Sequence, residues 1–294
     1  MMRSAEQPGG DESGAGRPII TLLTDFGSTD YFVPAVKGVI LSINPEARLI
    51  DLTHEVPAHD IAAGSFILGA SYGYYPPRTI HLAVVDPGVG STRRAIVVAT
   101  PQALFVAPDN GLLTGVYDNE PEYQVYDIGE RWRAAYLRRT ISPTFHGRDL
   151  FAPVAAWLSR GLPPAELGEL VSDPVRLPRP PAGQGIHESA GQLTGQLVGQ
   201  IIHIDRYGNG VTSLGLSQLP FATAAECGLE VAGQPISLIC RYFSEAAGST
   251  EPFAYPGSAG YWEIGCWCDS AARRLGIQRG AVVLVPGRPV GAEQ

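Results

Sequence analysis

The sequence predicts an α/β N-terminal domain, built on a mainly parallel sheet with Rossmann-like layers, and a small all-β C-terminal barrel. The first prediction rests on short apolar or β-branched runs that alternate with helical patterns through the first half of the chain. The second rests on the last third, where the runs are short and strand-like. Proline and glycine crowd together between Pro174 and Gly185, which is typical of a linker. We therefore expect a tail over 1–17, an α/β domain over 18–176, a linker over 177–186 and a C-terminal barrel domain over 187–294.

The strands of the α/β domain are predicted from short runs rich in Ile, Val and Leu. Three such runs are followed by polar or turn residues, and two more are close enough together to form a hairpin. The predicted strands are 19–23, 48–52 and 80–85, with the hairpin at 95–99 and 104–107.

Helices are predicted between and after these strands. Apolar residues recur at helical spacing in 31–42, and Asn44-Pro45 ends that helix. The next helix has an Ala/Gly-rich face suited to close packing. We expect Asp30 to cap the first helix and Asp149, or a residue near it, to cap the last. The predicted helices are 31–42, 61–74, 112–117 and 149–160.

The C-terminal domain is predicted to contain strands almost throughout. Only 271–275 has a helical pattern. The predicted strands are 192–204, 236–242, 261–267 and 281–285.

Composition and charge exclude several classes of function. The net charge of −8 and the pI near 5.3 argue against nucleic-acid and anionic-membrane partners. No apolar run reaches the roughly 20 residues that span a bilayer. The first 17 residues are rich in Gly, Ser, Glu and Asp, which predicts a disordered tail rather than a signal peptide and therefore a cytoplasmic protein. The four cysteines, Cys227, Cys240, Cys266 and Cys268, lack the spacing of a zinc site and are expected to be buried free thiols.

A polar segment, 86–94, follows the predicted strand 80–85 and is the most informative stretch of the chain. It combines Asp86, a turn of proline and glycines, and Arg93 beside Arg94. Ligands of open α/β sheets bind at the carboxyl ends of strands, which is where Asp86 is expected. Asp86 and Arg93 can hold a small polar molecule between opposite charges; the alternative is a surface turn with an incidental ion pair.

Two more clusters follow other elements of the same domain. Asp25 lies in the turn after the first predicted strand and is placed to accept hydrogen bonds from a ribose diol. No glycine-rich phosphate-binding motif is present, so a dinucleotide or nucleoside triphosphate is not indicated. His146 precedes a glycine and a helix, in a sterically open place. With Asp86 and Arg93 it can bind and polarise a water molecule. Metal assistance is the competitor, ranked lower because the arginines oppose a cation.

A fourth cluster, 204–210, lies at a strand end in the C-terminal domain. Asp205 offers a carboxylate, Tyr207 an aromatic ring and Asn209 an amide, which suit an ammonium group and a planar base. The alternative is a β-turn, because Tyr-Gly-Asn-Gly favours turns.

These clusters, in this order, resemble the S-adenosyl-L-methionine (SAM) hydrolase family, also called SAM hydroxide adenosyltransferases, which is related to the fluorinases and chlorinases. The resemblance covers the chain from about Ile19 to about Val285. The segments that carry it are LLTDFGSTDYFV at 22–33, VVDPGVGSTRRAI at 84–96, APDNGLL at 107–113, TFHGRDLFAPVAAWL at 144–158, IIHIDRYGNGVTSL at 201–214 and GSAGYWEI at 257–264.

The resemblance implies a homotrimer that hydrolyses SAM to adenosine and L-methionine and needs no cofactor or metal. It implies that SAM binds between the N-terminal domain of one subunit and the C-terminal domain of a neighbour. The residues that match the water-holding set are Asp86, Arg93 and His146. The implied substrate contacts are Asp25 to the ribose, Asp205 to the methionine ammonium, Ser258 to its carboxylate, Asn209 to the adenine amine, and Tyr207 and Phe243 to the adenine ring.

Two other functions remain open at this point. Halogenating relatives carry Tyr at the positions of Asp86 and His146 and Ser at that of Gly147, so the residues here favour hydrolysis over halogenation. A SAM- or adenosine-binding protein without turnover has no need of a water-activating set. Two segments depart from the family pattern, namely Gly257-Ser258-Ala259 and Gly265-Cys266-Trp267-Cys268.

Overall fold

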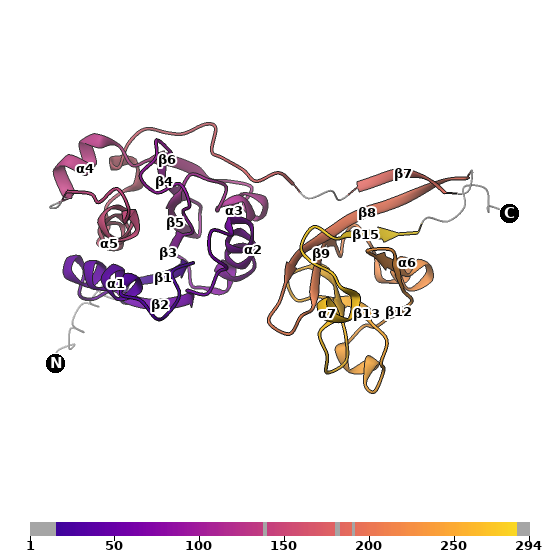
Figure 1. Ribbon diagram of the computed structural model, residues 1–294. Coiled ribbons are helices and arrows are strands. Elements are labelled where there is room, and N and C mark those ends of the chain that lie inside the picture. The colour runs from indigo at the N-terminus through magenta and orange to yellow at the C-terminus, as the bar shows by residue number, and fades with distance from the viewer. Residues whose placement is uncertain (1–15, 138–139, 180–182, 190–191, 287–294) are drawn as a thin grey trace, which may run out of the picture. The chain divides into compact units, whose positions relative to one another are not determined.

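The computed structural model describes residues 16–137, 140–179, 183–189 and 192–286, and the side chains of 183–189 and 192–196 are outside the description. The predicted tail over 1–17 lies almost wholly outside the described residues. The chain divides into two compact units, Met1–Leu177 and Pro178–Gln294 (Figure 1).

The first unit is built on a six-stranded sheet. Its strands, in sheet order, are β2 (Arg48–Thr53), β1 (Ile19–Thr24), β3 (Thr79–Val84), β5 (Ala103–Pro108), β4 (Ala95–Ala99) and β6 (Gln124–Asp127). The first four are parallel to one another, whereas β4 runs antiparallel to both of its neighbours. The predicted α/β class and the hairpin are confirmed. The sheet is nevertheless mixed, so the mainly parallel, Rossmann-like description is not confirmed; the three-residue turn between β4 and β5 permits only antiparallel pairing.

Helices cover both faces of this sheet (Figure 1). On one face, α1 (Phe32–Ile43) packs beside α5 (Ala152–Ser159), and both contribute to one apolar core with β1 and β3. On the other face, α2 (Ile61–Ser71) packs against α3 (Thr114–Asn119) over a second core. The remaining helical segments are η1 (Tyr72–Tyr74), α4 (Glu130–Tyr136), the π-helical turn η2 (Gly147–Phe151) and η3 (Pro164–Glu166).

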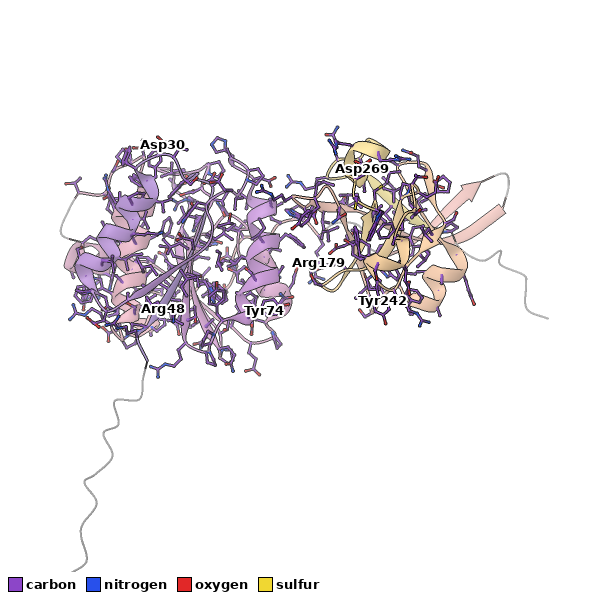
Figure 2. All side chains as sticks on the ribbon, turned by 90° about the horizontal axis from the view of Figure 1, so that it is seen from below. Asp30, Arg48, Tyr74, Arg179, Tyr242 and Asp269 are labelled. Carbon is purple, nitrogen blue, oxygen red and sulfur yellow. The ribbon has the colours of Figure 1, made fainter. Side chains whose placement is uncertain are left out.

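Two predicted helix caps are wrong. The residue that caps α1 is Tyr31, which makes no side-chain cap hydrogen bond, and Asp30 lies at the surface (Figure 2). Asp149 lies inside the π-helical turn η2 and accepts a hydrogen bond from the Ser142 amide at 3.0 Å. The helix that Asp149 was expected to cap begins only at Ala152, because the π-helical turn takes up the preceding residues.

The second unit is a barrel-like sheet of short strands. One path of pairings runs through β11 (Gln234–Ile236), β10 (Leu229–Val231), β15 (Val282–Val285), β8 (Gln192–Ile204), β9 (Gly210–Gly215), β14 (Tyr261–Gly265), β13 (Phe253–Pro256) and β12 (Leu238–Ile239). Strand β7 (Gly183–Ser189) pairs with β8 and begins inside the predicted linker. Helix α7 (Ala271–Leu275) was expected, while α6 (Phe221–Cys227) and the turn η4 (Phe243–Ala246) were not.

The side chains of the second unit form their own core around Trp262, which is fully buried and donates to the Leu219 carbonyl at 2.8 Å. All four cysteines are free thiols. Cys240 and Cys266 are buried as expected, whereas Cys227 is half-buried and Cys268 is exposed. Among the described residues, no helix has both the length and the apolarity to cross a membrane.

Helices α2 and α3 approach each other closely through two glycines, in agreement with the predicted close-packing face. A Cβ atom on Gly115 would lie 2.6 Å from the Ser65 carbonyl oxygen, and one on Gly69 would lie 3.2 Å from Gly115 Cα. The Gly115 amide also donates to Ser65 Oγ at 2.9 Å. Contact between these helices therefore depends on the absence of side chains at both positions.

Gly115→Ala is expected to lower the free energy of unfolding by about 1–3 kcal/mol, because the new methyl group must push α2 and α3 apart. The matched control is Gly38→Ala in α1, where a Cβ atom meets nothing within 4 Å. That substitution is expected to raise stability by roughly 0.5–1 kcal/mol, since glycine is a poor helix former. Urea unfolding of both variants measures the difference, and an unchanged midpoint for Gly115→Ala would contradict the close contact.

Candidate functional site

Asp86 and Arg93 form a direct ion pair at one end of the first sheet. Asp86 follows β3 and Arg93 precedes β4, so the loop 86–94 places both at the same edge. Arg93 Nε donates to Asp86 Oδ1 at 2.7 Å, and Arg93 Nη2 donates to Asp86 Oδ2. The guanidinium therefore binds both carboxylate oxygens, which is the strongest geometry for such a pair.

This ion pair is buried. The side chains of Asp86 and Arg93 are 5% and 9% exposed, and the Arg93 guanidinium lies 5.3 Å from the centre of the Phe151 ring. Burying two charges costs several kcal/mol per ion unless their hydrogen bonds are satisfied. The ion pair is thus already formed in the folded unit without a ligand.

His146 completes this set. Its Nδ1 lies 2.9 Å from Arg93 Nη2. A guanidinium has no acceptor atom, so Arg93 donates and His146 Nδ1 accepts. The neutral His146 ring consequently carries its proton on Nε2. Burial lowers the pKa of His146 below its usual 6.5, and the positive charge of Arg93 lowers it further while Asp86 opposes the change. His146 is therefore neutral at neutral pH.

The segment that carries His146 touches the loop 86–94 directly. Gly90 has a φ of 79°, and a Cβ atom there would lie 2.3 Å from the Pro143 carbonyl oxygen. Only glycine satisfies both the conformation and this approach. The glycine in the loop thus brings the residues before His146 against the ion pair.

A pocket of about 250 Å³ opens beside these groups and also contains Asp25. Asp25 Oδ2 accepts a hydrogen bond from the His59 amide at 2.9 Å, and His59 adopts a φ of 65°. Aromatic side chains form part of the wall, with Phe26 and Phe145 at a ring distance of 6.0 Å in an edge-to-face arrangement. The polar and apolar residues that line the pocket are Asp25, Phe26, Phe32, Ala58, His59, Val84, Asp86, Val89, Thr144, Phe145, His146 and Gly147.

Four of the predicted site residues therefore come together in the first unit, namely Asp25, Asp86, Arg93 and His146. The sequence missed His59 and the aromatic wall, because nothing in the local pattern shows that the segment after β2 returns to the end of β1. In the structure, the Gly27 amide donates to the His54 carbonyl oxygen at 2.8 Å, and this bond joins the segment after β2 to the end of β1.

The other predicted residues lie in the second unit, where Asp205 organises a tight turn. Asp205 Oδ1 accepts from the amides of Tyr207 and Asn209, both at 2.8 Å, and Oδ2 accepts from Asn209 Nδ2 at 2.8 Å. The turn that the sequence offered as an alternative is therefore present. A carboxylate has about four lone-pair positions, so Asp205 retains room for one further donor.

Asn209 is 6% exposed, and its Oδ1 is buried without a hydrogen-bond partner. The aromatic rings of Phe243 and Tyr255 surround the same point, because a Cβ atom on Gly265 would lie 3.1 Å from each ring and 3.2 Å from Asn209 Oδ1. An unsatisfied buried carbonyl oxygen costs about 1–3 kcal/mol and marks a place where a donor is missing.

Tyr207 and Ser258 are exposed within the second unit, and neither belongs to the aromatic cluster around Phe243. The sequence missed Tyr255, which contacts Phe243 edge-to-face at 5.4 Å and donates to Glu263 Oε2 at 2.6 Å. Burial raises the pKa of Glu263, and the charge of Asp205 raises it further while the Tyr255 bond opposes the change. The signal in the sequence was the separation of Tyr255 and Glu263, which places them opposite each other when β13 and β14 pair.

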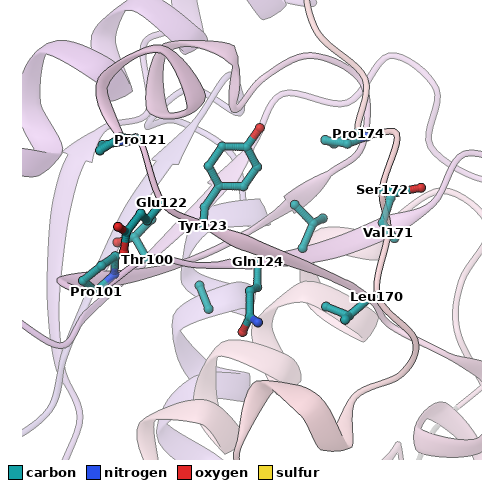
Figure 3. Close-up of a pocket in the computed structure, with 12 residues that line it drawn as sticks. Thr100, Pro101, Pro121, Glu122, Tyr123, Gln124, Leu170, Val171, Ser172 and Pro174 are labelled. Carbon is teal, nitrogen blue, oxygen red and sulfur yellow. The ribbon is translucent and has the colours of Figure 1, made fainter.

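A larger pocket, of about 920 Å³, lies elsewhere on the first unit (Figure 3). Thr100, Pro101 and Glu122 line one side of it, and Tyr123 and Pro174 also contribute. It contains none of the predicted site residues. Within the described ranges, no group of three or more His, Cys, Asp or Glu side chains is arranged to hold a metal ion.

Comparison with known proteins agrees with this division of the chain. The SAM hydroxide adenosyltransferase N-terminal domain matches residues 20–168, and the C-terminal domain of the same family matches 199–284. An (R)-S-adenosyl-L-methionine hydrolase from Thermus thermophilus is 36% identical over 274 residues, which covers 91% of this chain and 98% of the relative. One from Salinispora tropica is 40% identical over 200 residues, which covers 66% of this chain and 71% of the relative.

A solved structure has the same fold. The crystal structure of an uncharacterized conserved protein from Thermotoga maritima matches with a TM-score of 0.79 at 32% identity, covering 92% of this chain and 100% of that chain. A fluorinase from Nocardia brasiliensis is more distant, at 25% identity over 301 residues, which covers 92% of this chain and 97% of the fluorinase. The matches to both domain models, together with those to the two hydrolases, show that this chain belongs to the SAM hydroxide adenosyltransferase family.

Proposed function

We propose that this protein hydrolyses SAM to adenosine and L-methionine by in-line attack of water on C5′ of the substrate. The observation that carries the proposal is the buried set Asp86–Arg93–His146 beside the pocket that holds Asp25. The two hydrolase relatives support it by their names. The residues here thus suit a small polar nucleophile next to a ribose.

The chemistry of SAM makes few demands on a catalyst. The sulfonium carries a positive charge, and methionine leaves as a neutral thioether, so departure needs no general acid. The difficulty is the weakness of water as a nucleophile and its alignment opposite the C–S bond. A site that holds one water molecule opposite the C–S bond provides the alignment. A neighbouring base that takes a proton from this water makes it a stronger nucleophile.

The hydrogen-bond directions favour a division of roles within the set. The Nδ1 of His146 is occupied by Arg93, and its Nε2–H is a donor, so the ring can orient the oxygen of water but does not take its proton. The carboxylate of Asp86 still has free lone pairs and is the better proton acceptor. Arg93 holds both residues and favours hydroxide character in the bound water.

Substrate contacts follow from the remaining candidates. Asp25 is proposed to accept hydrogen bonds from the ribose hydroxyls. In the second unit, the unsatisfied Asn209 Oδ1 is proposed to accept from the adenine amine, with Phe243 and Tyr207 against the ring. Asp205 is proposed to bind the methionine ammonium through its remaining acceptor position, and Ser258 its carboxylate.

The proposal includes a homotrimer in which each site combines the first unit of one chain with the second unit of a neighbour. It also includes a cytoplasmic location, which the four free thiols support because thiols persist in a reducing compartment.

Turnover in ¹⁸O-labelled water is expected to place the label on the 5′ oxygen of adenosine, since water is the proposed nucleophile. Mass spectrometry of the nucleoside product measures this, with parallel incubations in chloride and in fluoride. A 5′-halogenated nucleoside as the main product would show a halogenase instead. Binding of SAM without any product would show a binding protein.

Asp86→Asn is expected to lower kcat by roughly 10²-fold or more, because the isosteric amide cannot accept the proton of water. Arg93→Ala and His146→Ala are expected to have effects of similar size. KM for SAM should change much less, since none of the three is assigned to the substrate. Asp118→Asn is the matched control, because Asp118 pairs with Arg176 at the surface. Steady-state kinetics near neutral pH decide, and near-normal turnover in all three variants would refute the assignment.

Mixing an Asp25→Ala protein with an Asp205→Asn protein is expected to restore part of the activity that each lacks alone. The change to Asn at 205 keeps one acceptor oxygen for the two turn amides. After subunit exchange, some sites combine an intact first unit with an intact second unit. Mixing Asp25→Ala with His146→Ala is the matched control, since every site then has a damaged first unit. If neither mixture recovers after verified exchange, each chain binds SAM alone.

A further inference from the structure

The turn that follows β5 lies between the two ends of the loop 86–94, called the catalytic loop below. In the sheet, β5 is flanked by β3 on one side and by β4 on the other. Because β5 is parallel to β3 and antiparallel to β4, its carboxyl end meets the end of β3 and the start of β4 at the same edge. Asp86 follows the first of these strands and Arg93 precedes the second. The residues of this turn, 108–111, are therefore placed to hold both.

Asn110 binds the backbone immediately before Asp86. Its Nδ2 donates to the Val85 carbonyl oxygen at 2.9 Å, and its Oδ1 accepts from the Leu112 amide at 3.2 Å. Val85 is fully buried and lies one residue beyond the end of β3, where the strand pairing has stopped. The Asn110 side chain thus satisfies a buried carbonyl and fixes the peptide from which the Asp86 side chain projects.

Asp109 binds the backbone and side chain immediately after Arg93. Its Oδ2 accepts from Arg94 Nε at 2.7 Å, and its amide donates to the Arg94 carbonyl oxygen at 3.1 Å. That same carbonyl accepts from Arg93 Nη1 at 3.3 Å. The side chain of Asp109 is 1% exposed, so little water competes for these bonds. Asp109 therefore orients one of the atoms that hold the Arg93 guanidinium.

We propose that Asn110 and Asp109 are positioning residues that keep the Asp86 carboxylate and the Arg93 guanidinium aligned for the reaction. The inference rests on the proposed hydrolysis, and it assigns no contact with substrate to either residue. It gives the turn 108–111 a role in addition to connecting β5 to the residues that follow. A displacement of the pair by about 1 Å is enough to cost about 10²-fold in rate, so small losses of alignment are measurable.

The test replaces one donor and leaves the turn in place. Asn110→Asp keeps an acceptor for the Leu112 amide and removes the donor to Val85, while Asn110→Ala removes both. The matched control is Thr114→Val. Thr114 is buried close to the same turn and binds the Gly111 carbonyl at 2.7 Å and the Leu177 amide at 2.8 Å, away from the catalytic loop.

Both Asn110 variants are expected to lower kcat for SAM by about 10- to 100-fold with KM within about threefold of wild type, measured below their unfolding temperatures. Thr114→Val is expected to retain at least about half of kcat. In an Asp86→Asn background, Asn110→Ala should cause no further loss, because the group that it positions is already gone. Equal losses in Asn110 and Thr114 variants, or the same loss with and without Asp86, would overturn the proposal.

A second measurement needs no substrate. Burial and the positive charge of Arg93 lower the pKa of His146, and the charge of Asp86 raises it. If Asn110 holds Asp86 in place beside the ring, Asn110→Ala should lower the His146 pKa further, and Thr114→Val should not change it. Proton NMR titration follows the ring, assigned by the signal lost in His146→Asn. If wild type does not hydrolyse SAM, the proposed function fails and this titration still decides the positioning role; an unchanged His146 pKa in both Asn110 variants would overturn it.

Discussion

Asp86 and Arg93 are charged side chains that water hardly reaches, and such a pair is stable only when its hydrogen bonds are close and complete. Several features of the first unit keep these hydrogen bonds close and complete. The order β3-β5-β4 brings the two ends of one short loop to the same edge of the sheet. Gly90 lets the loop touch the segment before His146, and Phe151 covers the guanidinium from the core side. The removal of one partner leaves the other as an uncompensated buried charge.

The same constraint sets the protonation of His146. Arg93 binds the carboxylate through Nε and Nη2 and directs the second N–H of Nη2 to the imidazole, which can only accept it. The fold therefore selects a neutral histidine with its proton on Nε2. In the proposed mechanism, a histidine in this state donates to the oxygen of water, and the carboxylate accepts the proton. The sequence showed an aspartate, an arginine and a histidine, but hydrogen-bond direction is a property of their arrangement.

The parts of the fold that could be predicted are those in which local pattern decides. The strand 19–23, the helix 31–42 and the hairpin 95–99 with 104–107 have a clear apolar period, and the structure has them within a residue or two. Strands such as β9 and β13 were missed because they are short, bordered by glycine or proline, and depend on neighbours distant in sequence. The hairpin predicts that β4 runs antiparallel to β5. That β4 is antiparallel to its other neighbour as well depends on the position of β6, which the sequence does not show.

The candidate site divides in the same way. Asp86, Arg93 and Asp25 could be found because polar residues directly follow or precede apolar strands, and strand ends meet at one edge. His146 could be grouped with Asp86 and Arg93 only as a hypothesis that the resemblance strengthened, since no local pattern brings residue 146 to residue 93. The bond from His59 to Asp25 and the partner missing at Asn209 Oδ1 lie beyond any pattern, because each depends on segments brought together by tertiary packing.

The candidate residues of the second unit differ from those of the first in their hydrogen bonding. Asp86 and Arg93 bind each other through two hydrogen bonds, whereas Asn209 Oδ1 is buried without a partner and Asp205 retains acceptor capacity. Glu263 has a raised pKa beside Asp205, so added negative charge is disfavoured there. A ligand with a hydrogen-bond donor for Asn209 and a positive charge for Asp205 would satisfy both residues. In the proposed function, these groups are the neutral adenine amine and the cationic methionine ammonium. The first unit thus contains a preformed Asp86–Arg93–His146 set, and the second has acceptor positions at Asn209 and Asp205 that the described residues do not fill.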